Sequence, residues 1–146
     1  MFTTSTADGR LYSRPLTTQQ IEPDGHLWFA TDMDSEKVDE VQQQPRVNVS
    51  YASASKNTYV SVTGKAKVLR NQAKIDELWT PAMKIFFPKG KDDPNLGLIR
   101  VAIESAEYWD GPSGVIGKAI YLVAAAVTEN PGVMSDHGTV DLGKKR

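Results

Sequence analysis

The sequence predicts a mainly β domain with flanking helices, in the form of a small antiparallel barrel of about six strands. Two Asp-Gly pairs, at 8–9 and 24–25, are typical of tight turns between antiparallel strands, because glycine accepts a positive φ. The helical patterns are inserted among the strands and do not alternate with them, which argues against a parallel Rossmann sheet. Gly64 interrupts a long alternating strand and predicts a bend of the kind that curls a sheet into a barrel.

Alternating or continuous apolar patterns locate the strands, and helical periodicity with capping residues locates the helices. Strands are expected over residues 2–6, 10–17, 27–31, 47–51, 59–69 and 96–105, with extended chain to 110. Helices are expected over residues 35–44, 72–79, 81–86 and 115–128. Pro15 cannot donate to a sheet ladder, so it marks a strand edge or a bulge. We expect one domain over 1–128 and a polar tail over 129–146, with a short strand around Val140.

Composition narrows the classes of function. The chain has 146 residues and a formal net charge of −1, so no overall field attracts nucleic acid or an anionic membrane. The absence of cysteine rules out disulfides and thiolate chemistry, and two distant histidines give a metal site little to build on. No signal-peptide pattern is present, and the longest apolar run, 119–127, is far shorter than the ~20 residues of a membrane helix. We expect a cytoplasmic protein without nucleic-acid, membrane or metal partners.

A candidate anion site lies where the strand 27–31 runs into the next helix. A helix N-terminus carries unpaired N–H groups and a partial positive charge, to which Thr31 and Ser35 add hydroxyls and Lys37 a full charge. Arg14 is able either to fork onto phosphate oxygens or to pair with a carboxylate. The alternative is that Ser35 only caps the helix and Lys37 is solvated. Acidic neighbours oppose an anion unless they point outward: Asp32, Asp34 and Glu36.

The sequence gives little support for catalysis by the protein's own side chains. No nucleophile elbow, Gly-x-Gly-x-x-Gly or Walker sequence is present, so a reactive group has to come from a cofactor. Most aromatic residues are expected in the core. Trp109 differs, because it stands at a strand end just before a Gly-Pro turn, where its ring can lie on a ligand.

Several short motifs follow one another in a fixed order. They are Ser13-Arg14-Pro15-Leu16, Leu27-Trp28-Phe29-Ala30-Thr31 with Ser35 and Lys37, and residues 59–66, 77–81, 87–94 and 107–110. As an ordered set over about 2–126, they resemble the FMN-binding split-barrel proteins related to pyridoxamine 5′-phosphate oxidase, in particular the general stress protein branch. The resemblance implies a six-stranded antiparallel Greek-key split barrel that forms a homodimer with FMN in clefts between the chains.

The same resemblance assigns roles to residues. Residues 14–16 and 28–31 would run beside the isoalloxazine ring, Ser35 and Lys37 would hold the phosphate, and two tryptophans, one or both from the partner chain, would close the site. The cofactor-binding set is therefore Arg14, Pro15, Leu16, Trp28, Phe29, Ala30, Thr31, Ser35, Lys37, Trp79 and Trp109. Relatives usually have a helix before the first strand, which this sequence lacks, so one wall of the pocket is expected to be missing.

The implied function is that of a flavin-dependent oxidoreductase of unknown substrate, with a small-molecule electron donor or acceptor. The oxidase itself uses an Arg-x-His near its C-terminus, and His137 is not preceded by an arginine, so oxidation of pyridoxamine phosphate is not expected. Alternatives are a flavin carrier or sensor without turnover, a barrel that uses FAD, a deazaflavin or haem, and a dimeric barrel with an empty cleft.

Overall fold

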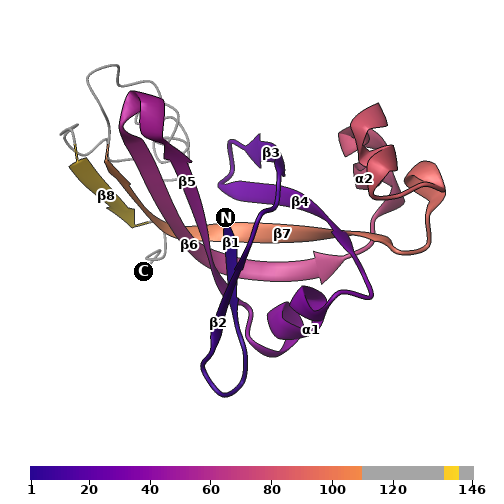
Figure 1. The fold of residues 1–146 in the computed structure, drawn as a ribbon, viewed down its shortest axis with the longest axis horizontal. Helices are drawn as coiled ribbons and strands as arrows, with labels where there is room; N and C mark the ends of the chain where they lie inside the picture. Colours follow the sequence, from indigo (N-terminus) through magenta and orange to yellow (C-terminus); the bar gives the residue numbers. More distant parts are fainter. Residues whose placement is uncertain (110–136, 142–146) are drawn as a thin grey trace.

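One antiparallel sheet contains every strand of the described residues, 1–109 and 137–141, in this computed structural model (Figure 1). The strands are β1 Phe2–Ser5, β2 Leu11–Arg14, β3 Thr18–Glu22, β4 His26–Asp32, β5 Arg46–Ser53, β6 Thr58–Leu69, β7 Leu96–Trp109 and β8 His137–Asp141. Their order is β2-β1-β5-β6-β7-β4-β3, and β8 also pairs with β7. The mainly β fold with flanking helices is therefore confirmed, and so is the strand around Val140.

The number of strands differs from the expected six, because the described residues form eight. The strand expected over 10–17 ends at Arg14, and the polar segment after Pro15 forms β3, which the sequence did not reveal. A strand at the edge of a sheet keeps one side in water and needs no apolar alternation. The polar sequence Thr18-Gln19-Gln20 is therefore typical of a connection, although it forms the start of β3 and pairs with β4.

Both Asp-Gly pairs form hairpin turns in which three residues lie between the paired ends, Thr6 and Arg10 in the first turn and Glu22 and His26 in the second. Gly9 and Gly25 each have a φ of 85°, and their N–H groups donate to the carbonyls of Thr6 (2.9 Å) and Glu22 (3.0 Å). This is the turn in which a left-handed glycine closes a three-residue loop. The turns set the register of β1 on β2 and of β3 on β4.

Gly64 lies at a bulge in β6, as its position in an alternating strand predicts. The register between β6 and β7 shifts between Thr63 and Gly64. A Cβ atom at Gly64 would overlap the carbonyl oxygen of Ala102 and would lie 2.7 Å from Cγ1 of Val101. Only glycine permits the two long strands to approach so closely where the sheet bends.

In the described part of the chain, two α-helices and three short 3-10 turns flank the sheet. They are α1 Glu36–Gln43, α2 Gln72–Leu78, η1 Ala54–Lys56, η2 Pro81–Ile85 and η3 Gly90–Asp92. Val38 and Val41 are the buried residues of α1, and Ile75 and Leu78 those of α2. None of the described helices is long and apolar enough to cross a membrane. The helix expected over 115–128 and the domain boundary after 128 lie outside the described residues.

Strand β4 separates two apolar clusters, because its side chains alternate between its faces. Leu27 and Phe29 belong to the cluster inside the curled sheet, together with Phe2 from β1. Trp28 belongs to a second cluster, which α2, η2 and the start of β7 cover. The expectation that this strand is apolar and buried on both faces is therefore confirmed. The candidate site lies at the C-terminal end of β4.

Lys74 fastens α2 to the edge strand β3. Its Nζ donates to Gln20 (2.7 Å), Glu22 (2.7 Å) and Glu77 (2.9 Å) and lies 5.0 Å from the centre of the Trp28 ring. The hydrogen bond from Lys74 lowers the pKa of the Glu22 carboxyl. This contact holds the segment that follows α2 against the β3–β4 hairpin, so that the two form opposite walls of one cleft.

Candidate functional site

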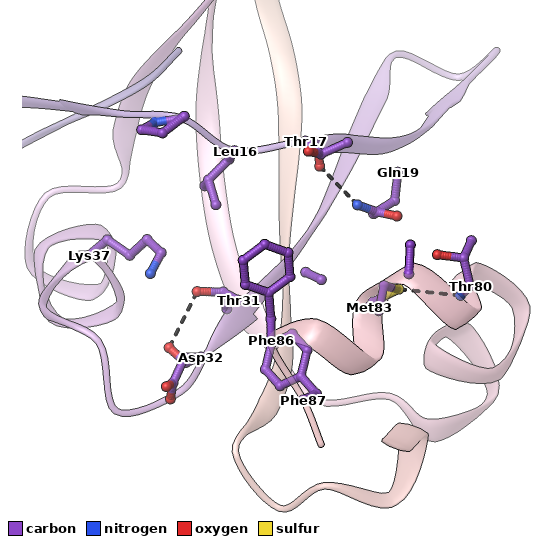
Figure 2. A pocket seen from close by; sticks show the side chains of 13 residues that line it. Leu16, Thr17, Gln19, Thr31, Asp32, Lys37, Thr80, Met83, Phe86 and Phe87 are labelled. Carbon is purple, nitrogen blue, oxygen red and sulfur yellow. Dashed lines mark hydrogen bonds between the residues drawn. The ribbon is translucent and has the colours of Figure 1, made fainter. Parts of the chain in front are cut away.

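A cleft of about 400 Å³ lies between the end of β4, the start of α1 and the turn η2 (Figure 2). The η2 wall is more than 40 residues from the end of β4 and the start of α1 in sequence, and the pairing of β3, β4 and β7 brings it close to them. The lining residues are Pro15, Leu16, Thr17, Gln19, Ala30, Thr31, Asp32, Lys37, Thr80, Ala82, Met83, Phe86 and Phe87. This volume is in the range of pockets that hold small molecules and cofactors.

Lys37 points into the cleft from the first turn of α1 (Figure 2). Its Nζ donates to Oγ of Ser35 at 2.7 Å, and that hydroxyl donates to the carbonyl of Asp32 at 2.6 Å. Partial burial lowers the pKa of Lys37, as does the nearby positive charge of Arg14. Lys37 makes no ion pair with a carboxylate of the described residues. The cleft therefore holds a partly desolvated cation that makes no ion pair with the nearby carboxylates of Asp32 and Glu40, which raise its pKa from beyond contact distance.

Arg14 faces α1 and not the cleft. Its Nη1 and Nη2 atoms bind the two carboxylate oxygens of Glu40 at 2.7 and 2.9 Å, and Nη1 also donates to Oγ1 of Thr4 at 2.9 Å. Of the two roles that the sequence left open for Arg14, the structure shows the pairing with a carboxylate. The bidentate contact joins the β1–β2 hairpin to α1 and so fixes the helix that carries Lys37.

We expect the Arg14–Glu40 pair to make stability depend on pH in the acidic range. The hydrogen bond from Arg14 lowers the pKa of Glu40 below its value in the unfolded chain. A lowered carboxyl pKa stabilises the folded state above the unfolded pKa, and this contribution is lost as the pH falls through the folded pKa. Urea unfolding should show a drop in the free energy of unfolding below about pH 4.5 in the wild type, and a smaller drop in Glu40→Gln.

At neutral pH, Glu40→Gln should cost about 2 kcal/mol, because it leaves the partly buried Arg14 with only the exposed carboxylate of Glu36, at 3.9 Å, as a countercharge. Asp34→Asn is the matched control: Asp34 lies in the exposed turn before the same helix and forms no ion pair among the described residues. Equal stability of Glu40→Gln and the wild type from pH 3 to pH 7 would show that the pair contributes nothing.

Several of the residues that the sequence singled out are gathered here. Those that line the cleft are Pro15, Leu16, Ala30, Thr31 and Lys37. Ser35 touches the cleft through its hydrogen bond with Lys37. Trp79 comes directly before Thr80 in the lining and packs against the cluster around Trp28. Trp28 and Phe29 themselves are buried, with 6% and 0% of their surface exposed.

Trp109 is the last residue of β7, which runs through the whole sheet (Figure 1), and the cleft residues of β4 pair with the first residues of that strand. The cleft residues Ala30 and Thr31 pair with the start of β7, at Leu98 and Gly97, whereas Trp109 pairs with Tyr59. Eleven residues of strand separate Leu98 from Trp109, which is roughly 35 Å along the chain. Within one chain, Trp109 is therefore not a wall of this cleft.

The sequence did not reveal the wall that η2 contributes. Met83 and Phe87 are buried beneath it, whereas Phe86 stands in the cleft with 77% of its surface exposed. A short helix starting at Pro81 was expected, but nothing local shows that it packs opposite β3 and α1. The one available signal was the pair of adjacent bulky apolar residues, Ile85 and Phe86, in a short helix too small to bury both.

Comparison with known proteins identifies relatives over most of the chain. Protein bli-3 of Neurospora crassa is 25% identical over 144 residues, which cover 92% of this chain and 69% of that protein. The general stress FMN/FAD binding protein from Xanthomonas citri is 30% identical and superposes with a TM-score of 0.62, covering 75% of this chain and 79% of that chain.

A protein related to general stress protein 26, from Clostridium acetobutylicum, is 19% identical and has a TM-score of 0.68 over 75% of this chain and 78% of that chain. At that identity the likeness supports the fold alone. The sequence family described as pyridoxamine 5′-phosphate oxidase like matches residues 1–132, which is nearly the whole chain. The chain therefore belongs to the pyridoxamine 5′-phosphate oxidase-like family.

Proposed function

We propose that this chain binds FMN in the cleft, with the phosphate on Lys37 and Ser35. The observation that carries the proposal is the partly buried Lys37 ammonium, which has a hydroxyl at 2.7 Å and no described carboxylate paired with it. Ser35 occupies the N-cap position of α1 and makes no capping hydrogen bond; its hydroxyl proton goes to the carbonyl of Asp32 and would have to turn from there to the phosphate. A phosphate would supply the missing countercharge through charge-assisted hydrogen bonds and would face the positive end of α1.

The ring would lie along the lining segments 15–17 and 30–31. Residues 15–17 fall between β2 and β3, outside the sheet ladder, so their backbone groups are able to face a ligand. Pro15, Leu16 and Ala30 present apolar surface suited to a flat ring, and Thr31 adds a hydroxyl. FMN supplies redox chemistry when bound, whereas these residues would orient it and shield one face from water.

A homodimer with the cofactor between the chains is part of this proposal. Trp109 is 41% exposed and roughly 35 Å along β7 from its own cleft, so only a second chain could bring it to a ring bound there. A two-fold axis would place each Trp109 at the partner's site and leave both sites equivalent. Trp79 would close the site from within the same chain.

We further propose a flavin-dependent oxidoreductase that works in the cytoplasm with a small-molecule electron donor or acceptor. A relative that is 30% identical is named an FMN/FAD binding protein, which supports the cofactor class. Thirteen residues of varied polarity line an open cleft, which leaves room for a second molecule to approach the cofactor. The alternative is a flavin carrier or sensor that does not turn over.

The visible spectrum of the purified protein tests the cofactor, and its response to redox agents tests turnover. We expect a flavin spectrum, either as purified or after reconstitution with FMN. In an oxidoreductase, the colour should bleach with an electron donor and return repeatedly when an acceptor is added. A bound flavin that no electron donor reduces would support the alternative of a flavin carrier without turnover. A colourless protein that FMN does not reconstitute would contradict the proposed cofactor.

A further inference from the structure

We propose that the half of the cleft formed by η2 and β3 binds a second ligand, an uncharged planar aromatic molecule, against the ring of Phe86. This inference rests on the proposed FMN site, because it assigns Lys37 to the phosphate. It goes beyond that site by naming the chemical class of the molecule that meets the flavin. Three features of the lining support it: the distribution of charge, the exposed aromatic ring and the neutral polar groups beside that ring.

Charge in the cleft is confined to one end. Of the thirteen lining residues only two are charged, Asp32 and Lys37, and both lie beside α1 (Figure 2). Once a phosphate occupies Lys37, no lining cation remains for a second anion. A second anion would also be repelled by the bound phosphate and by Asp32. The η2 half itself offers no carboxylate to pair with a cation, so a cation there would lose hydration in exchange for only the distant attraction of the phosphate and Asp32.

The η2 half is apolar and presents an aromatic face. Phe86 directly follows η2 and stands in the cleft between Lys37 and Met83 (Figure 2), and Ala82 and Phe87 also line the cleft. Phe86 is 77% exposed, whereas Met83 and Phe87 keep only 7% of their surface exposed. The ring of Phe86 therefore adds little to the core and remains available for stacking on a flat ligand, an interaction that adds to simple burial of apolar surface.

Neutral polar side chains edge this apolar surface. Gln19 from β3 and Thr80 from the start of η2 both line the cleft, and the amide of Gln19 donates to the carbonyl of Thr17 at 3.2 Å. Uncharged amides and hydroxyls suit the carbonyl or hydroxyl groups of a neutral ring compound, which they orient without requiring a countercharge. The η2 half thus combines an apolar face with a neutral polar edge.

The test compares three ligands that share one ring system and differ in charge. Calorimetric titration of the FMN-loaded protein at neutral pH would use 2-naphthol, 2-naphthalenesulfonate and protonated 2-naphthylmethylamine. We expect 2-naphthol to bind about tenfold or more tightly than either ion. The disadvantage of the sulfonate should shrink as salt rises from about 0.05 M to about 0.5 M, because screening weakens its repulsion from the phosphate. Equal or tighter binding of either ion would overturn the proposal.

Variants of two adjacent residues test the place of binding. Phe86→Ala should weaken 2-naphthol about five- to tenfold, and Phe86→Tyr should preserve the binding, because it keeps the ring. Ile85→Ala is the matched control, since Ile85 is 80% exposed in the same turn and does not line the cleft. An unchanged Kd in Phe86→Ala, or an equal loss in Ile85→Ala, would contradict the assignment to Phe86.

The failure of this inference can be told apart from the failure of the FMN proposal. The Kd for FMN is measured first on each protein, and Phe86→Ala should leave it within about twofold if Phe86 meets the second ligand. If the wild type takes up no FMN, the FMN proposal falls and the naphthol titration is run on the FMN-free protein. Binding of 2-naphthol that depends on Phe86 would then still support the aromatic site, and its absence would overturn the site as well.

Discussion

The double variant Lys37→Ala with Ser35→Ala should lose most of its affinity for FMN. The Lys37 ammonium has no described carboxylate partner, and the Ser35 hydroxyl lies 2.7 Å from it, so a phosphate on the ammonium would also reach that hydroxyl once its proton turns from the Asp32 carbonyl. Hydrogen bonds to charged groups contribute roughly 1.5–3 kcal/mol each. We expect a loss of about 3 kcal/mol, or a rise in the Kd for FMN of more than a hundredfold. Titration of the FMN-free protein, followed by quenching of flavin fluorescence, measures this Kd.

Two controls separate loss of the phosphate site from loss of the fold. Lys67→Ala removes an exposed lysine of β6 that forms no ion pair among the described residues, and it should leave the Kd for FMN unchanged. Lys37→Arg keeps the positive charge and should recover part of the affinity. The free energy of unfolding without FMN should stay within about 0.5 kcal/mol of the wild type in the double variant. Unchanged FMN affinity in that variant would place the phosphate elsewhere.

Phe29→Ala should destabilise the fold more than it affects FMN binding directly. The resemblance placed Phe29 beside the flavin, whereas the structure buries it completely and sets its ring 5.2 Å from that of Phe2, at 70°. Truncation of a buried phenylalanine to alanine costs about 3–5 kcal/mol, because apolar burial is lost and a cavity remains. A fall of this size in the free energy of unfolding, measured by urea denaturation without FMN, is the expected result.

If Phe29→Ala does not fold, a milder substitution at the same position tests the same prediction. Phe29→Leu should cost about 1–2 kcal/mol and leave the Kd for FMN close to the wild-type value, since only packing inside the sheet changes. Leu11→Ala is a surface control, because Leu11 is 72% exposed on β2 and does not line the cleft. A Phe29→Leu protein of normal stability with greatly weakened FMN binding would show that Phe29 contacts the cofactor.

Much of the fold could be predicted because its signals are local. The long apolar strand β4, the alternation in β6 with its bulge at Gly64, and the buried stripe of α1 follow from residue types at short spacings. The same holds for the turns at Gly9 and Gly25, although each closes a loop one residue longer than the two-residue form. β3 was missed because an edge strand made of Thr18-Gln19-Gln20 carries no apolar alternation.

The site was harder to predict because its walls meet only in three dimensions. Local sequence placed Ser35 and Lys37 at the start of a helix; in the structure Lys37 lines the cleft, and Ser35 accepts a hydrogen bond from it. The sequence could not show which group binds Arg14. Glu40 lies 26 residues further on, and a guanidinium is able to bind either a carboxylate or a phosphate. Phe86 was missed for the same reason, since its contact with the cleft depends on how α2 docks on β3.

The ratio of flavin to protein in the native assembly tests the central claim most directly. Multi-angle light scattering would give the mass of the purified, FMN-saturated protein, and absorbance after denaturation would give the bound flavin. A cleft in each chain that is completed by a second chain predicts an assembly of two chains with one FMN per chain. A protein that saturates with FMN as a single chain, or one that forms the dimer but takes up no flavin, would contradict it.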